Sequence, residues 1–252
     1  MATTETAASP PLTRPAVRVV LWLLSWAVAA ALVLGGAYSL LDVGARHTFT
    51  VRLAYTGVRS LVVVDGTGNV DLTGAPAGGA VVVSERVTQG LSTPRREAAR
   101  GRGGVLRLTA SCHPLLTPEC NVGYEIAVPS GIAVAASSGD GDVSARDLVS
   151  TARVDLSSGA GDVSAGRLSA PDVRLSSGAG DVHADLLGNL SRLVASSGAG
   201  DVSLTVPNAV YRVNATSGAG SVSDQGLRQD PASPRVIIAT SGAGDVTIQA
   251  AR

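Results

Sequence analysis

Five aspartates at a nearly regular spacing are the residues whose type and repetition first suggest chemistry. Each closes a copy of the motif SGxGDV, and they are Asp142, Asp162, Asp181, Asp201 and Asp245. A stack of such carboxylates could bind calcium, which takes oxygen ligands. Calcium-binding β-rolls are built from nonapeptide repeats, however, whereas this motif recurs about every 20 residues. The longer period favours the alternative, in which each aspartate bonds nearby backbone amides of its own turn.

The serine pairs that precede each motif, such as Ser157 and Ser158, are candidate nucleophiles by type. A nucleophile is singular, however, and no GxSxG elbow surrounds any of these serines. The chain has three histidines, His47, His113 and His183, and His183 takes an outward place on an alternating segment. All 20 basic residues are arginines, which excludes a P-loop lysine and a Schiff-base lysine. We expect no enzyme, no catalytic residue, no metal and no cofactor.

Two cysteines, Cys112 and Cys120, bracket a short segment that contains His113 and two prolines. In an exported chain, two cysteines that close such a loop are typical of a disulfide. The alternative is a metal site made of Cys112, His113 and Cys120, but it lacks a fourth nearby ligand and CxxC spacing. We therefore predict a disulfide between Cys112 and Cys120.

A basic run, Arg95, Arg96, Arg100 and Arg102, lies in a segment that we interpret as a solvated loop. Contact of this loop with anionic lipid head groups or wall polymers is the alternative. Over the whole chain, 20 basic residues balance 20 acidic residues, and the formal net charge is zero. This balance argues against a nucleic-acid partner, because nucleic-acid-binding domains carry a basic surface.

An internal repeat supplies the elements that must position these residues. The first glycines of successive motifs are separated by 20, 19, 20, 20 and 24 residues. Self-similarity at such a period is typical of solenoids and arrays. Glycine adopts positive φ without steric cost, so two glycines in each motif permit a sharp corner. These turn glycines are Gly139, Gly141, Gly159, Gly161, Gly178, Gly180, Gly198, Gly200, Gly218, Gly220, Gly242 and Gly244.

Apolar and polar residues alternate on both sides of each corner, which predicts half-buried strands. Each copy therefore predicts a strand, a sharp corner, a second strand and a looser return segment that leads to the next coil. The return is anchored by a leucine nine positions after the first glycine, namely Leu148, Leu168, Leu187 or Leu227. Asp224 interrupts the inward set in the copy that has Ser221 instead of aspartate. A narrow interior that admits only small side chains accounts for an aromatic content of 3%.

The repeat begins before its regular part, because residues 66–70 (GTGNV) match the same motif. Three further alternating segments follow, at 81–87, 105–109 and 124–128. We predict an all-β domain: a single-chain β-solenoid of stacked coils of about 20 residues. It covers 47–252, with the regular repeats at 132–252. No polar cap precedes Arg252, so we expect an open edge at the last coil.

An apolar run of 23 residues, 19–41, precedes the solenoid and contains no charged residue. At about 1.5 Å per residue, a helix of this length spans a hydrocarbon core of about 30 Å. A cleaved signal peptide is the alternative, but its apolar region is shorter. Arg14 and Arg18 favour a cytoplasmic N-terminus. We predict a cytoplasmic tail at 1–18, one transmembrane helix at 19–41 and an extracytoplasmic domain.

The sequence resembles the bacterial putative-adhesin family, a domain of unknown function also called toast-rack-like. The matching residues are 124–129 (YEIAVP) leading into 137–143 (SSGDGDV), the SGAG repeats that follow, and SGAGDV at 241–246. The resemblance covers roughly 60–250 and implies a β-solenoid of Gly-Asp-Val repeats, with an N-terminal membrane segment in many actinobacterial members. The family has no established catalytic residues to transfer to this chain, and the resemblance implies adhesion or envelope-stress signalling.

We therefore expect a membrane-anchored, non-catalytic interaction scaffold of the cell envelope. Its expected partners are the membrane, crossed by one span, and a cell-wall polymer or a membrane protein. The alternative is a regulatory or sensory module of an envelope-stress response that acts through a membrane partner. A tail of 18 residues is too short to fold, so that alternative would require lateral contacts of the helix.

Overall fold

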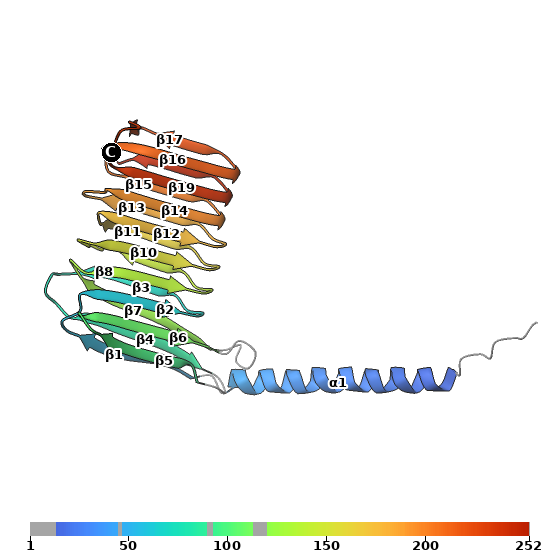
Figure 1. Ribbon diagram of the computed structural model, residues 1–252. Helices are drawn as coiled ribbons and strands as arrows, with labels where there is room; N and C mark the ends of the chain where they lie inside the picture. Colours follow the sequence, from blue (N-terminus) through green and yellow to red (C-terminus); the bar gives the residue numbers. More distant parts are fainter. Residues whose placement is uncertain (1–13, 45–46, 90–92, 113–119, 252) are drawn as a thin grey trace, which may run out of the picture. The chain divides into compact units, whose positions relative to one another are not determined.

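The computed structural model describes residues 14–44, 47–89, 93–112 and 120–251, and the side chains of 14–18 and 38–44 are outside that description. The chain divides into two units, one that ends at Ala45 and one that covers Arg46–Arg252. The first contains the helix α1 (Arg14–Gly44), and the second contains all the strands of the described chain (Figure 1).

Helix α1 is apolar on all sides rather than amphipathic. Its segment Val19–Ala37 has a mean hydropathy of 2.2, no part of it is buried, and it is long enough to cross a membrane. Trp22 and Trp26 are 68% and 62% exposed, and their ring centroids lie 6.0 Å apart. A helix that exposes such side chains on every face requires an apolar environment, which fits a membrane anchor or a signal sequence.

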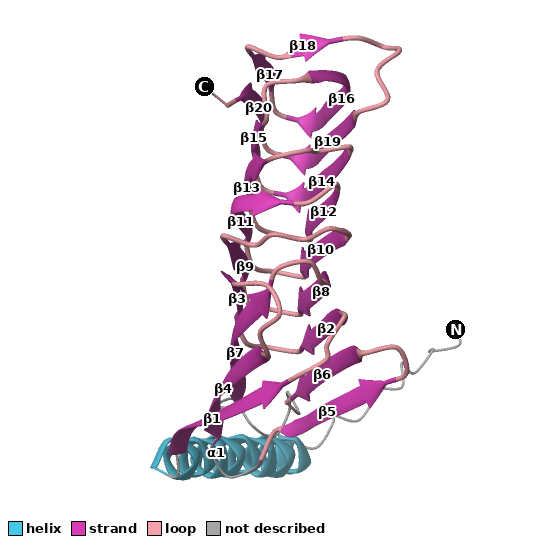
Figure 2. Cartoon of the chain, turned by 90° about the vertical axis from the view of Figure 1, so that its left-hand side faces the viewer, coloured by secondary structure: helices cyan, strands magenta, loops and turns pink. Residues whose placement is uncertain are grey.

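The second unit is a pair of ten-stranded sheets that face each other (Figure 2). Sheet A runs in the order β1 (His47–Tyr55), β4 (Val81–Gln89), β7 (Asn121–Pro129), β3 (Val70–Ala75), β9 (Val143–Arg146), β11 (Val163–Ser169), β13 (Val182–Leu187), β15 (Val202–Val206), β20 (Val246–Ala250), β17 (Val222–Gln225). Sheet B runs in the order β18 (Arg228–Gln229), β16 (Val210–Ala219), β19 (Val236–Ala243), β14 (Arg192–Ala199), β12 (Asp172–Ser177), β10 (Arg153–Ser158), β8 (Ala133–Ser138), β2 (Ser60–Asp65), β6 (Val105–Ser111), β5 (Arg95–Gly101).

Each coil gives one strand to each sheet, and equivalent strands of neighbouring coils pair in parallel. Val154 of β10, for example, pairs with Val134 of β8 and with Val173 of β12. Burial alternates along most strands, as in β10, so the Val, Leu and Ala of the coils fill one continuous core between the sheets. The β-solenoid that the repeat predicts is confirmed. The copy at 66–70 is also a coil, because β2 and β3 pair with β8 and β9 in the predicted register.

The coils are not stacked in chain order at either end. The last coil of the chain, β19 and β20, lies between the coil of β14 and β15 and that of β16 and β17. The coil of β2 and β3 likewise lies between that of β6 and β7 and that of β8 and β9. The open edge expected at the last coil is therefore wrong. That coil is internal, and the coil with Ser221 and Asp224 ends the stack.

The base of the solenoid, by which we mean β1, β4, β5, β6 and β7, differs from the regular coils. Here β1 pairs with β4, β4 with β7, and β5 with β6, all antiparallel. The basic run from Arg95 is consequently not a solvated loop, because residues 95–101 form strand β5. A second prediction is also wrong: Leu187 is 42% exposed, and a register shift in β11 and β13 puts Leu186 in the core opposite Leu168. Leu148 and Leu168 are buried as predicted, and Leu227 is partly buried.

Candidate functional site

The serine directly before the first turn glycine of each motif points into the core and connects one coil to the next by a hydrogen bond. Its hydroxyl donates to the carbonyl of the second turn glycine in the neighbouring coil, at 2.7–2.8 Å. The pairs are Ser138 to Gly68, Ser158 to Gly141, Ser177 to Gly161, Ser197 to Gly180, Ser241 to Gly200 and Ser217 to Gly244. These serines are hydrogen-bonding groups of the core, because Ser138, Ser158, Ser177, Ser197 and Ser241 are only 5–7% exposed.

The turn glycines are required by close stacking more than by their backbone angles. A Cβ on Gly161 would lie 2.5 Å from the carbonyl oxygen of Gly141, and one on Gly159 would lie 2.3 Å from that of Gly139. Among the twelve predicted turn glycines, positive φ occurs at Gly200, Gly220 and Gly244. The explanation from positive φ is therefore wrong for most of this set. Backbone approaches backbone at each corner, and any side chain would separate the coils.

The five motif aspartates form a ladder along the same corner. The Oδ1 atom of each accepts the backbone N–H of the equivalent residue one coil further on. Asp162 donates to Asp142, Asp181 to Asp162, Asp201 to Asp181 and Asp245 to Asp201, at N···O distances of 2.7–2.9 Å. Asn69 extends this ladder towards the base and Ser221 ends it. The predicted bonding to amides of the same turn is thus corrected: the amides belong to the next coil.

The hydrogen bonds of this ladder offset the electrostatic repulsion between stacked carboxylates. Each carboxylate accepts a backbone N–H of the neighbouring coil, and hydrogen bonds to a charged acceptor are stronger than those between neutral groups. At the end of the ladder, the backbone N–H and the hydroxyl of Ser221 both donate to Asp245 and lower its pKa. Within the described residues, no group of three or more His, Cys, Asp or Glu side chains is placed to hold a metal ion. The ladder therefore has a structural use, and calcium binding remains the less favoured hypothesis.

The cysteines lie between β6 and β7, and the described histidines lie on β1 and β13. Cys112 and Cys120 form the predicted disulfide, with an S–S distance of 2.00 Å and a Cα–Cα distance of 5.8 Å. His183 is exposed on the outer face of sheet A, beside Ser164 and Ser203. His47 is exposed at the start of β1, and His113 lies outside the described residues.

The two outer faces of the regular coils differ in charge. The outward positions of β8, β10, β12, β14, β19 and β16 carry four arginines and two aspartates: Arg153, Arg174, Arg192, Arg212, Asp155 and Asp172. The outward positions of β9, β11, β13, β15, β20 and β17 carry Arg146, Arg167 and Asp185, and otherwise mainly Ser, Thr and Gln. Arg167 is neutralised by an ion pair with Asp147, which directly follows β9. Sheet B therefore presents a net positive face, and sheet A a nearly neutral polar face.

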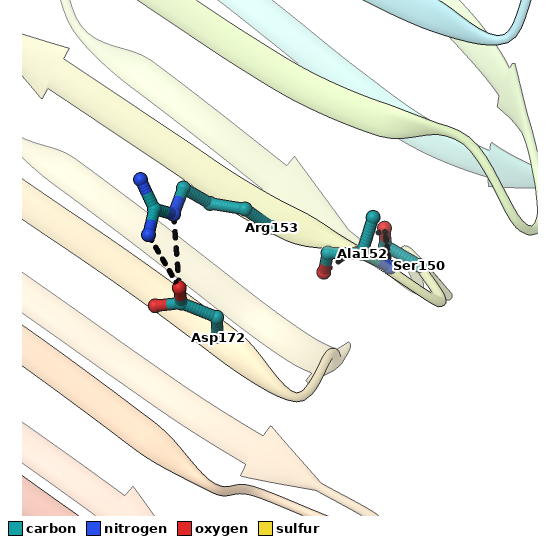
Figure 3. A network of polar contacts seen from close by, with 4 residues as sticks. All are labelled: Ser150, Ala152, Arg153 and Asp172. Carbon is teal, nitrogen blue, oxygen red and sulfur yellow. Dashed lines mark hydrogen bonds and ion pairs between the residues drawn. The ribbon is translucent and has the colours of Figure 1, made fainter.

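A shallow depression of about 250 Å³ lies in the positive face, lined by Arg153, Asp172, Arg174, Arg192 and Val194. Both Nε and Nη2 of Arg153 donate to Oδ2 of Asp172 on the next strand, at 2.9 and 2.7 Å (Figure 3). Nearby, Ser150 fixes the return of the chain, since its hydroxyl donates to the carbonyl of Ile132 and accepts the N–H of Ala152. Among the described residues, Arg174 and Arg192 form no ion pair.

Two carboxyl groups are buried near the base. Glu85 is inward on β4 and accepts a hydrogen bond from Nη1 of Arg96 at 2.9 Å. Asp65 takes the corner-serine position of its coil, opposite Ser138, and its Oδ2 has no hydrogen-bond partner. Burial raises the pKa of Asp65 from 3.8 to about 6. Burial is also the largest cause that raises the pKa of Tyr124, followed by the negative charge of Glu85. Our reading of the sequence missed both acids, although Asp65 directly precedes Gly66, where other coils have serine.

The opposite end of the stack is closed by polar groups. Asp224 occupies an inward position of β17 but lies in the terminal coil, where its carboxylate accepts a hydrogen bond from Gln229 on the segment of β18. Val222 is 46% exposed in the same strand. An inward charge on an edge strand discourages the addition of further strands.

Comparison with known proteins agrees with this architecture. The model of the Toastrack DUF4097 family matches residues 43–252. No curated protein matches the chain. A putative cell adhesion protein from Clostridium sporogenes is similar in structure, with a TM-score of 0.50 and 14% identity over 81% of this chain and 100% of that one.

A putative adhesin from Bacteroides fragilis is similar over 81% of this chain and 97% of its own, at 17% identity and a TM-score of 0.44. At such identities the likeness extends to the fold alone. The family match covers both sheets and every coil, including the corner motifs. The chain therefore belongs to the Toastrack DUF4097 family.

Proposed function

We propose that the protein is a membrane-anchored, extracytoplasmic and non-catalytic scaffold whose positive face binds an anionic cell-wall polymer. The observation that carries this proposal is the difference between the two outer faces. The serines and aspartates of the corner are engaged in holding the coils together, whereas Arg174 and Arg192 stand exposed and unpaired among the described residues.

Stacked coils lie about 4.8 Å apart, so the face presents guanidinium groups at a repeating spacing. Arg153, Arg192 and Arg212 lie in one row across the strands, two coils from one to the next. A guanidinium group binds phosphate or carboxylate through paired hydrogen bonds. A flexible polymer that carries such groups along its length can therefore engage several coils at once, and weak single contacts add up to useful avidity.

The test is co-sedimentation of the full chain in nanodiscs with insoluble wall material. In the variant Arg174→Gln/Arg192→Gln we expect most of the binding to be lost, and binding of the native chain should weaken as salt is raised. Arg146→Gln on sheet A is the matched control and should bind as the native chain does. Equal binding by the double variant would reject the positive face as the binding surface.

The regulatory alternative makes a different prediction. Crosslinking in the native membrane would then give one defined membrane protein, and that product would persist in the Arg174→Gln/Arg192→Gln variant.

A further inference from the structure

The base of the solenoid leaves part of its core-facing surface uncovered. Phe49 and Leu53 of β1 are 38% and 41% exposed, although they pair with Val87 and Val83, which are fully buried. These two residues occupy inward positions, but the stack has no further coil to cover them. β1 is one edge of sheet A and β5 is one edge of sheet B, so both edge strands meet solvent at this end.

Arginines take the corresponding inward positions on β5. Arg96 pairs with Ala110 and Arg100 with Leu106, and both partners are buried core residues. The guanidinium carbon of Arg96 lies 5.6 Å from the ring centroid of Phe49, and that of Arg100 lies 5.1 Å from that of Tyr55. Arg96 is also bound by Glu85, whereas Arg100 forms no ion pair among the described residues.

The end of the core is therefore closed by aromatic rings and arginines from opposite sheets. The whole chain has seven aromatic residues, and two of them lie on this surface. We call the set Phe49, Leu53, Tyr55, Arg96 and Arg100 the base surface. An aromatic ring beside a cationic group is the combination that suits the boundary between hydrocarbon and charged head groups.

We propose that the base surface rests on anionic lipid head groups of the membrane that α1 anchors, an inference that depends on the proposed anchoring. Two residues separate Gly44, the end of α1, from His47, the start of β1. If α1 spans the bilayer, the chain reaches β1 within a few residues of the lipid surface. Phe49 and Leu53 then contact the interface, and Arg100 meets lipid phosphates.

A second copy of the chain, paired edge to edge through β1, is the competing occupant. We favour lipid because Arg100, which forms no ion pair among the described residues, carries a positive charge that fits anionic lipid but repels an identical surface.

The test uses the full chain in nanodiscs, with Trp22→Phe and Trp26→Phe to remove the native tryptophans. Phe49→Trp reports on the base surface, and Val222→Trp reports on the far end of the stack, where the native side chain is also exposed. Lipids brominated near the head group quench tryptophan that touches the interface. We expect quenching to remove most of the Phe49→Trp emission and to leave that of Val222→Trp nearly unchanged.

The charge requirement is tested by lipid composition and one further variant. Quenching of Phe49→Trp should be stronger with phosphatidylglycerol than with phosphatidylcholine alone, and Arg100→Gln should remove that difference. Leu53→Trp repeats the measurement at a second position in case Phe49→Trp perturbs the strand. Absence of quenching at both positions overturns the proposal, and so does a β1-to-β1 crosslink between two copies.

Carbonate extraction of native membranes separates this inference from the anchoring on which it rests. If the chain resists extraction from native membranes by carbonate but shows no quenching, the anchoring is supported and the base-surface proposal is refuted. A chain that carbonate extracts refutes the anchoring and the base-surface proposal together.

Discussion

The regular coils and the base are two solutions to the problem of covering a β-sheet core. Each regular coil is covered by the next, so its interior is filled mainly by Val, Leu, Ile and Ala, and its polar groups bond across to the neighbour. The base has no neighbour on one side and uses antiparallel edge strands, rings, arginines and a buried glutamate instead. Repetition therefore builds the length of the solenoid, and departures from the repeat mark its ends.

The largest difference in stability between the two regions is expected when a side chain is added at a corner of a regular coil. We expect Gly161→Ala to destabilise the solenoid by about 3 kcal/mol, because its Cβ would lie 2.5 Å from the carbonyl oxygen of Gly141. Gly123→Ala in β7 of the base is the matched control, since its Cβ would meet the nearest atom at 3.8 Å. Guanidinium unfolding of the two variants measures the difference, and equal midpoints would contradict the stacking argument.

The substitution Asp65→Ser tests whether the serine that the regular coils have at this position would stabilise the coil of β2 and β3. Because burial raises its pKa from 3.8 to about 6, the folded state holds the proton more tightly than the unfolded chain. Asp65 therefore contributes stability below pH 3.8 that is lost as the pH rises through about 6. We expect Asp65→Ser to stabilise the protein by roughly 2 kcal/mol at pH 7 and to flatten the loss of stability between pH 4 and 6. Unfolding curves across that range provide the measurement, and an unchanged slope in the variant would argue against Asp65 as the titrating group.

A smaller effect is expected when a regular coil loses its corner hydroxyl. Ser177→Ala removes the 2.8 Å bond to the carbonyl of Gly161 and leaves that buried oxygen without this donor. The expected cost is about 1–2 kcal/mol, opposite in sign to that of Asp65→Ser. Ser176→Ala, on the adjacent outward position, should change the midpoint of unfolding very little. A similar cost for both serines would mean that the hydroxyl bond is not the cause.

The sequence predicts the coils themselves because period-two burial and a corner that excludes side chains both leave a direct mark on residue type. It predicts the register of β2 with β8 for the same reason, through the match at Gly66 and Gly68. It does not predict which coil lies beside which. Every coil carries the same corner, so any two are compatible neighbours, and only Asp224 and Ser221 mark the coil that ends the stack.

The candidate site was less predictable. The bond from each aspartate to the next coil depends on stacking that a single motif does not show, so the sequence favoured the amides of its own turn. Strand β5 was missed because its residues, rich in arginine and alanine, lack the alternation of a half-buried strand. Arginines can occupy its inward positions because the end of the stack is open, so that a guanidinium group can lie over a ring and still reach solvent.

The insertion of the last coil between two earlier ones has a consequence for synthesis. When a ribosome has released the chain up to β17, strand β14 is complete but its final neighbour β19 does not yet exist. One edge of β14 is paired with β12, and the strand then available for the other edge is β16, whose corner carries the same motif and can pair in the same register. The nascent protein must therefore hold β16 apart from β14, or release it again, before residues 236–250 can enter the gap.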